Sequence, residues 1–142
     1  KGELIGINTA IYSQSGGNVG IGFAIPTSTV EFVLESILNN GKVTRGFLGV
    51  QPSSISSYIA KGLELPSKNG AFISKLVANG PAEKAGLLPG DIVTKIDKNL
   101  IVDKEDLLET IANIKPGTNI TVEIIRKGEK LLIPTEIGER PK

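Results

Sequence analysis

The sequence predicts an α+β fold in two unequal parts. After residue 42, five short β-rich runs alternate with glycine turns and two helical segments. This order is typical of a small domain whose strands curl into a partly open barrel. Before residue 41 the chain instead has the pattern of two strands followed by one helix. We therefore expect a boundary within residues 41–44, between an incomplete segment (residues 1–41) and a domain (residues 42–142).

The first segment is predicted to be a β-hairpin followed by a helix. Residues 4–11 and 19–25 are β-rich, and the polar, glycine-containing stretch 13–18 between them is typical of a hairpin loop. After Pro26 begins a helix whose end is signalled by Gly41. Apolar residues recur along it at helical spacing: Val30, Val33, Leu34, Ile37 and Leu38. One hairpin and one helix are too small to bury a core of their own, so this segment should need a partner.

The second part is predicted to contain two helices and five strands. Residues 81–86 form one helical turn with proline at its first position and glycine at its end. A longer helix is expected at residues 104–114, where Asp103 can cap the first turn and residues 115–117 end the helix. The strands are expected at residues 47–51, 70–76, 92–96, 120–126 and 130–137.

The composition excludes several classes of function. With 16 basic and 15 acidic residues the net charge is +1, so no affinity for nucleic acid is expected from charge alone. The sequence has no histidine and no cysteine, which removes the commonest zinc, haem and iron–sulfur ligands and any Ser-His-Asp mechanism. We expect no metal, no cofactor and, with no apolar run of about 20 residues, no membrane span. The abrupt start at Lys1-Gly2 suggests a piece of a longer polypeptide.

Three runs in the second part together resemble the signature of a PDZ domain. They are Gly70-Ala71-Phe72-Ile73, then Gly80-Pro81-Ala82-Glu83-Lys84-Ala85-Gly86-Leu87, then Pro89-Gly90-Asp91-Ile92-Val93. Each run alone is a weak signal, but the composite is specific. The resemblance implies a partly open barrel of five to six strands with two helices, which binds extended peptides.

The upstream residues resemble the HtrA/DegP family (Do-like) of serine proteases. Residues 2–11 and 20–26 are similar to the end of that family's trypsin-like domain, and residues 45–50 match its junction into the first PDZ domain. The resemblance implies that residues 1–41 are the last hairpin and helix of a protease domain. It also implies a periplasmic, homo-oligomeric endopeptidase in protein quality control, which binds unfolded or C-terminal segments of misfolded proteins.

No catalytic residue is expected within this chain. The family's catalytic histidine, aspartate and serine all precede the first residue, so the fragment alone should not be an enzyme. Ser15-Gly16-Gly17 looks like the Ser-Gly-Gly of a trypsin-like nucleophile, but it follows the Gly-Ile-Asn-Thr strand, whereas the family's nucleophile precedes that strand. The favoured interpretation is a glycine turn at a loop tip.

Three residues of the first segment are candidates for a substrate pocket. Thr9, Ala10 and Ile11 correspond to the strand that, in the resembled proteases, lies beside the substrate and helps to wall the primary specificity pocket. An ordinary barrel strand with Ile11 in the core is an equally good interpretation.

The second part contains a candidate site for a peptide carboxylate. PDZ domains add an extended peptide to a sheet edge and hold its terminal carboxylate with backbone amides. In Gly46-Phe47-Leu48-Gly49 the two glycines permit unusual backbone angles, so the amides of Phe47, Leu48 and Gly49 can converge on one anion. Arg45 precedes this turn and either attracts the carboxylate or is simply solvated.

The predicted helix at residues 104–114 should form the other wall of the groove, opposite the strand that begins at Val50. Its apolar residues span too wide an arc to point entirely inward. We expect Leu107 and Ile114 in the core, and Leu108 and Ile111 in the groove. With Leu48 these groove residues would receive a terminal Val, Leu, Ile or Phe side chain.

Two further interpretations are carried forward. The alternative function is a PDZ adaptor of a secretion or tail-processing system with no attached protease, but such an adaptor has no reason to carry the upstream hairpin.

The hairpin and helix of residues 1–41 would expose an apolar face and unpaired strand edges if left uncovered. We therefore expect the fragment to self-associate through residues 1–41, as a two-fold dimer or by strand exchange.

Overall fold

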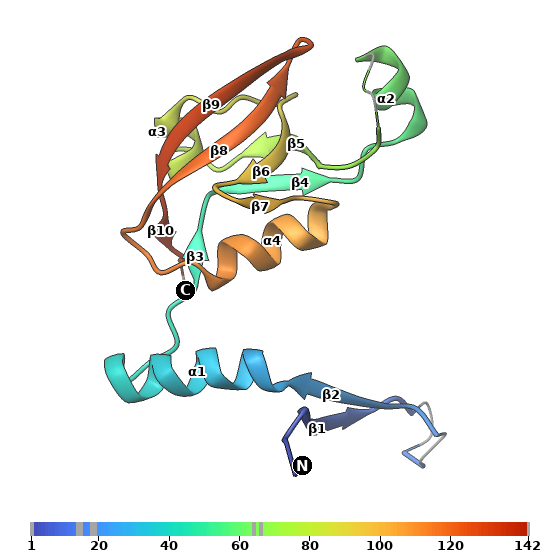
Figure 1. Cartoon of the computed structure of the whole chain (residues 1–142), viewed down its shortest axis with the longest axis vertical. Helices are drawn as coiled ribbons and strands as arrows, with labels where there is room; N and C mark the ends of the chain where they lie inside the picture. Colours follow the sequence, from blue (N-terminus) through green and yellow to red (C-terminus); the bar gives the residue numbers. More distant parts are fainter. Residues whose placement is uncertain (1, 14–15, 18–19, 64, 66, 142) are drawn as a thin grey trace. The chain divides into compact units, whose positions relative to one another are not determined.

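The computed structural model describes residues 2–13, 16–17, 20–63, 65 and 67–141. The chain forms two compact units, Lys1–Val43 and Thr44–Lys142. We call them the first and second unit and describe each by itself (Figure 1).

The first unit is a hairpin followed by a helix. Strand β1 (Gly6–Ile11) pairs antiparallel with β2 (Gly22–Pro26), and helix α1 (Thr27–Asn40) follows directly. The helix ends as predicted at Gly41, which takes the left-handed backbone angle φ 68° and donates its N–H to the carbonyl of Ile37 at 2.8 Å.

The first unit leaves most of its apolar side chains exposed. Within the described chain, every buried apolar side chain belongs to the second unit. The large apolar residues exposed on the hairpin and helix are Leu4, Ile5, Ile7, Ile11, Tyr12, Ile21, Phe23, Ile25, Leu34, Ile37 and Leu38. An apolar surface of this extent on so small a unit is typical of a contact surface.

The second unit is built on an antiparallel sheet. In spatial order its strands are β4 (Val50–Ser53), β5 (Ala71–Leu76), β6 (Ile92–Ile96), β8 (Asn119–Arg126) and β9 (Glu129–Glu136), with β7 (Asn99–Leu100) also paired to β6. A separate ladder joins β3 (Gly46–Phe47) to β10 (Gly138–Glu139). The α+β class is confirmed. The sheet is open, with β4 and β9 at its two edges, and its described strands do not close into a barrel.

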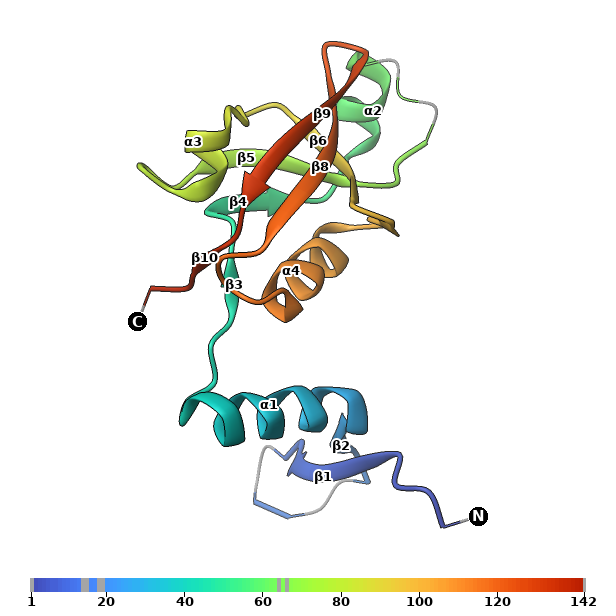
Figure 2. The ribbon, with the colours of Figure 1, turned by 60° about the vertical axis from the view of Figure 1, so that its left-hand side comes forward.

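Three helices accompany the sheet. The predicted α3 (Pro81–Ala85) and α4 (Lys104–Asn113) are present, and a further helix that the sequence did not suggest, α2 (Ser57–Gly62), follows β4. The capping prediction for α4 is confirmed, because Asp103 Oδ1 accepts a hydrogen bond from Asp106 N at 2.8 Å. Figures 1 and 2 both show α4 running beside β4, which places this helix at the uncovered edge of the sheet.

The core lies between the sheet and helices α3 and α4. Its buried members come from β5, β6 and β8, from both helices and from the connecting segments: Leu48, Ala71, Ile73, Ala82, Leu87, Val93, Ile96, Ile101, Leu107, Ile111, Ile120, Val122, Ile124 and Ile137. Residues 47–51, predicted as one strand, are instead two short strands interrupted at Leu48 and Gly49. This interruption positions the candidate site.

Candidate functional site

Residues 46–49, which comprise β3 and the two residues before β4 and which we call the 46–49 loop, leave two backbone amides without an acceptor among the described residues. The carbonyl of Leu48 accepts a hydrogen bond from Ala82 N, and the carbonyl of Gly49 accepts one from Val77 N, both at 2.8 Å. The amides of Leu48 and Gly49 donate to no acceptor in the described part of the chain. Both residues are buried, and buried amides without an acceptor are rare. The loop therefore presents two adjacent donors that an external acceptor can complete.

The two glycines of this loop are required for different reasons. Gly49 adopts φ 79°, a left-handed conformation that favours glycine, and a Cβ there would contact Gly80 Cα at 3.4 Å. Gly46 has no such angle. Instead, a Cβ on Gly46 would collide with the carbonyl oxygens of Ile111 and Ile114 at the end of α4. The sequence interpretation of Gly46 as a residue with an unusual backbone angle was wrong, because close packing against the helix explains it.

The neighbouring residues Arg45 and Phe47 are tied to the C-terminal strand. Phe47 pairs with Gly138 in the β3–β10 ladder, and the carbonyl of Arg45 accepts a hydrogen bond from Arg140 N at 3.1 Å. The Phe47 backbone thus belongs to a ladder, which distinguishes it from Leu48 and Gly49. Arg45 is exposed directly before the loop.

Strand β4 has one free edge, and that edge begins at the loop. On its other side β4 pairs with β5, from Val50 opposite Leu76 to Ser53 opposite Phe72. Within the part of the chain that the structure describes, no further strand pairs with β4. A strand edge beside a helix can accept one more extended segment by backbone hydrogen bonding.

Of the two α4 residues predicted to line the groove, one is exposed and the other is buried. Leu108 is 50% exposed, in line with its predicted groove position. Ile111 was predicted to lie in the groove beside it, but it is only 4% exposed and packs in the core with Leu107. The two core residues lie four apart on the helix and so share one face. Ile114 is half-buried against the same core.

Leu48, predicted as part of the groove pocket, is also buried in the core, and only 1% of it is exposed. Of these three residues only Leu108 is exposed, while Leu48 and Ile111 are buried in the core. Val50 is half-buried at the start of β4.

The residues predicted to wall a protease pocket lie together on β1 of the first unit. Thr9, Ala10 and Ile11 are all exposed, and Thr9 Oγ1 donates a hydrogen bond to the carbonyl of Phe23 at 3.5 Å. The interpretation of Ile11 as a core residue is not met within this unit, since Ile11 is exposed. Ser15, the residue that resembles a nucleophile, lies outside the described residues.

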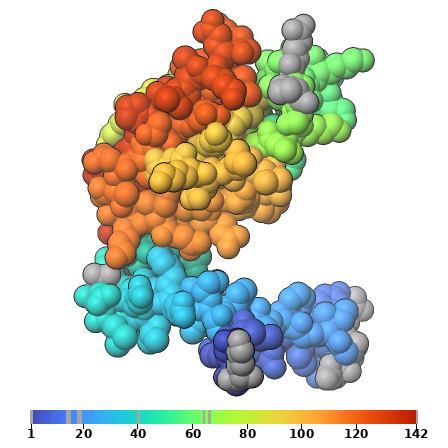
Figure 3. Space-filling view, viewed as in Figure 1, coloured from blue at the N-terminus to red at the C-terminus, as the bar shows by residue number. Residues whose placement is uncertain are grey.

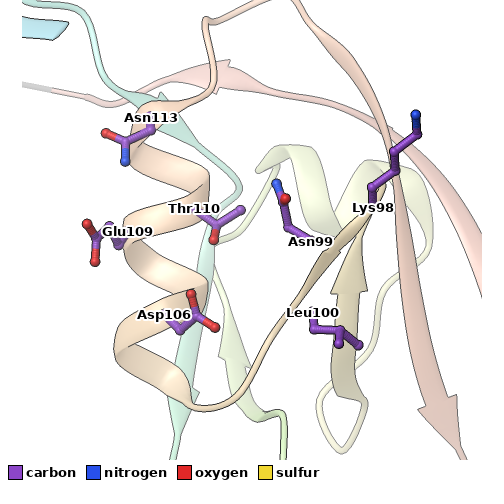
Figure 4. Close-up of a pocket in the computed structure, with 7 residues that line it drawn as sticks. All are labelled: Lys98, Asn99, Leu100, Asp106, Glu109, Thr110 and Asn113. Carbon is purple, nitrogen blue, oxygen red and sulfur yellow. The ribbon is translucent and has the colours of Figure 1, made fainter. Parts of the chain in front are cut away.

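The sequence did not predict the recesses elsewhere on the second unit, of which one, of about 390 Å³, lies between α3 and residues 134–138. A polar one of about 550 Å³ lies between α4 and residues 98–100 (Figure 4). Its lining residues are Lys98, Asn99, Leu100, Asp106, Glu109, Thr110 and Asn113. An apolar one of about 480 Å³ lies between α2 and Phe72 of β5. None of these recesses includes the 46–49 loop. Figure 3 gives the space-filling view of the chain.

The described residues show neither a cluster of metal ligands nor a helix that could span a membrane. The described residues contain no group of three or more Asp, Glu, His or Cys side chains placed to hold a metal ion. Among the same residues, no helix has the length and apolar character required to cross a membrane.

An edge strand, a flanking helix and a glycine loop at the start of the strand are an arrangement typical of PDZ domains. Residues 46–137 match the sequence profile of the family described as "PDZ domain", and this chain belongs to that family.

The similarity to known proteins extends beyond this domain. Over 141 residues, 99% of this chain, it is 44% identical to the probable periplasmic serine endoprotease DegP-like of Rhizobium meliloti (strain 1021). It is 39% identical over 141 residues to the protein of the same description from Chlamydia trachomatis serovar D. The chain spans 28% of the length of each of these relatives.

Solved structures give the same result. The chain matches "HtrA-type protease AlgW with tripeptide" with a TM-score of 0.86 and 42% identity, covering 99% of this chain and 47% of that one. It matches the serine endoprotease from Yersinia pestis with a TM-score of 0.70 and 30% identity, covering 99% of this chain and 44% of that one. The resemblance to HtrA/DegP proteases is confirmed.

Proposed function

We propose that this chain is the peptide-recognising region of an HtrA-type periplasmic serine endoprotease in protein quality control. In this proposal residues 1–41 are the last hairpin and helix of the protease domain, and residues 42–142 are the PDZ domain. The alignment of nearly the whole chain with relatives named as endoproteases favours this function over an adaptor without a protease. The exposed apolar residues of the first unit support it too, because the remainder of a protease domain would cover them.

The proposed ligand is the C-terminal segment of a misfolded protein. Its backbone adds as a strand to the free edge of β4, and its carboxylate accepts hydrogen bonds from the amides of Leu48 and Gly49. The last side chain lies against Leu108. Two of the matched structures are described as complexes with a tripeptide and with a decapeptide, which supports a peptide ligand for this chain as well.

The expected affinity is modest. Hydrogen bonds to a charged group contribute about 1.5–3 kcal/mol each, and burial of one apolar side chain contributes about 1.5–3 kcal/mol. The loss of translational and rotational freedom opposes these gains by about 4–15 kcal/mol. Backbone hydrogen bonds along β4 add to these gains, and we expect binding no tighter than micromolar, where a dissociation constant of 1 μM corresponds to about −8 kcal/mol.

Peptide cleavage is assigned to the rest of the parent protein. A trypsin-like mechanism needs a histidine as general base, and these 142 residues contain none. This chain therefore selects the substrate, and the parent, proposed to be a homo-oligomer, hydrolyses it.

The observation that carries the proposal is the pair of unused amides at the start of a free strand edge. The test is a titration of the whole chain with a peptide ending in a free hydrophobic residue and with the same peptide amidated at its C-terminus. The free acid should bind at least tenfold more tightly, because only it places a charged acceptor at Leu48 and Gly49. Equal affinities for the two peptides, or no binding of either peptide, would refute the proposal.

A further inference from the structure

An ion pair joins the buried Asp91 to the partly buried Arg126, outside residues 46–49. Asp91 is 1% exposed and forms two hydrogen bonds with Arg126, from Nε to Oδ1 at 2.7 Å and from Nη2 to Oδ2 at 2.8 Å. The hydrogen bond to Asp91 and the charge of that carboxylate raise the pKa of Arg126. Such a two-point pairing fixes the orientation of both side chains.

This pair also holds the end of α3. Nη2 of Arg126 donates to the carbonyl of Gly86, the left-handed residue that ends the helix, at 2.8 Å. Oδ2 of Asp91 accepts a hydrogen bond from Leu88 N at 2.8 Å. Arg126 thus connects the end of β8 to the C-terminal end of α3 and to the segment that follows it.

The other end of α3 holds the peptide-binding loop. Ala82, which is fully buried in the first turn of α3, donates its N–H to the carbonyl of Leu48. Gly80 packs closely against Gly49, since a Cβ on Gly80 would lie 3.5 Å from Gly49 Cα. The helix has only five residues, so a shift at its C-terminal end must move its first turn as well.

We propose that Arg126 is a positioning residue for the peptide-binding loop and acts on the amides of Leu48 and Gly49 through α3. This inference rests on the proposed function. Arg126 lies in β8, which does not pair with β4, so any effect on peptide affinity is indirect, and the hydrogen bonds to Gly86 and Leu48 connect it to the loop through α3. A sequence pattern could not suggest this role, because residues 48, 86 and 126 are far apart along the chain.

The central variant is Arg126→Lys in the whole chain. Lysine keeps the positive charge for the buried Asp91, but a single ammonium group cannot reproduce the fork of hydrogen bonds to Asp91 and Gly86. Substitutions along a coupling network change binding by about 0.5–2 kcal/mol, which corresponds to about a 2- to 30-fold change in affinity. We expect Arg126→Lys to bind the free-acid peptide more weakly than wild type by a factor in this range. The affinity is measured by calorimetry under conditions in which the variant is fully folded.

A second readout separates positioning from general loss of stability. In the free protein, the NMR signals of the Leu48 and Gly49 amides should shift in Arg126→Lys. The matched control is Ile120→Val, which loosens the core packing of the same strand and leaves every hydrogen bond of Arg126 intact. The control should lower the unfolding temperature without moving these signals or the affinity.

The outcomes are distinct. If folded Arg126→Lys binds peptide as wild type does and its loop signals stay in place, or if Ile120→Val shows the same losses, the positioning role is refuted. If wild type binds no peptide, the proposed function fails, and the loop signals still decide whether Arg126 positions the amides. Should Arg126→Lys fail to fold, the double variant Asp91→Asn with Arg126→Gln, which buries no unpaired charge, replaces it in both measurements.

Discussion

Replacement of Leu108 by glutamate should weaken peptide binding and leave the fold intact. Leu108 is 50% exposed on α4, so about half of its side chain remains for a ligand to cover. Full burial of a leucine is worth about 1.5–3 kcal/mol, and half of that, about 0.8–1.5 kcal/mol, corresponds to a 4- to 12-fold loss of affinity. The introduced carboxylate adds a desolvation penalty when an apolar terminal residue approaches it.

The assay is a peptide titration combined with chemical denaturation. Stability should change by less than about 0.5 kcal/mol, as for other surface substitutions. The matched control is Leu132→Glu, because Leu132 is 66% exposed on β9, at the opposite edge of the sheet from β4. It should bind as wild type does.

The neighbouring substitution Ile111→Glu should behave differently, because Ile111 is 4% exposed and a carboxylate there would be buried in the core. A buried unpaired charge costs several kcal/mol, a large share of the about 5–15 kcal/mol that stabilises a domain. If Leu108→Glu binds peptide normally, or if Leu132→Glu weakens binding equally, the assignment of the groove to β4 and α4 is refuted.

Three further predictions follow from the same account. The chain should not cleave unfolded casein because it contains no histidine; hydrolysis that survives purification and is lost in Ser15→Ala would contradict this. In light scattering the chain should self-associate through its exposed hairpin and helix, whereas a version that begins at Thr44 should be monomeric; monomers in both cases would exclude association through residues 1–41. The hydrogen bond from Thr94, followed by the charges of Lys130 and Lys95, lowers the pKa of Glu123 below 4.5. Above about pH 4.5, Glu123→Gln should therefore have a lower free energy of unfolding than wild type. This difference should close as the pH falls through the lowered pKa of Glu123. A difference that grows in acid would contradict the prediction.

Local signals predicted the second unit well where the elements are long or capped. Asp103 caps α4 as its position before the apolar run indicated, and Gly41 ends α1 in the expected left-handed conformation. The strands of two residues, β3, β7 and β10, are too short to show an alternating pattern. Helix α2 has six residues and no repeating apolar face, so only Ser56, whose Oγ accepts from Ile59 N, marked its start.

The candidate site was predicted in part. The glycine loop is evident from sequence, but the reason for Gly46 is a contact with Ile111 and Ile114, more than sixty positions along the chain. Leu108 and Ile111 are both apolar and lie on nearly the same side of α4, and only the packed structure shows that Ile111 is in the core. The link from Arg126 to the loop depends on three long-range hydrogen bonds of Arg126 and on a fourth, from Ala82 N to the Leu48 carbonyl, and it has no sequence signal.

The central claim is that the amides of Leu48 and Gly49 receive a peptide carboxylate. The most direct measurement is an NMR titration of the ¹⁵N-labelled chain with a peptide whose last residue is hydrophobic and carries a free carboxylate. The same titration is repeated with a peptide of identical sequence that is amidated at its C-terminus. The account predicts that the free acid shifts the Leu48 and Gly49 amide signals most strongly, followed by those of β4, and that the amidated peptide shifts them far less. If both peptides leave these two signals unmoved while others shift, the ligand binds elsewhere and the account is wrong.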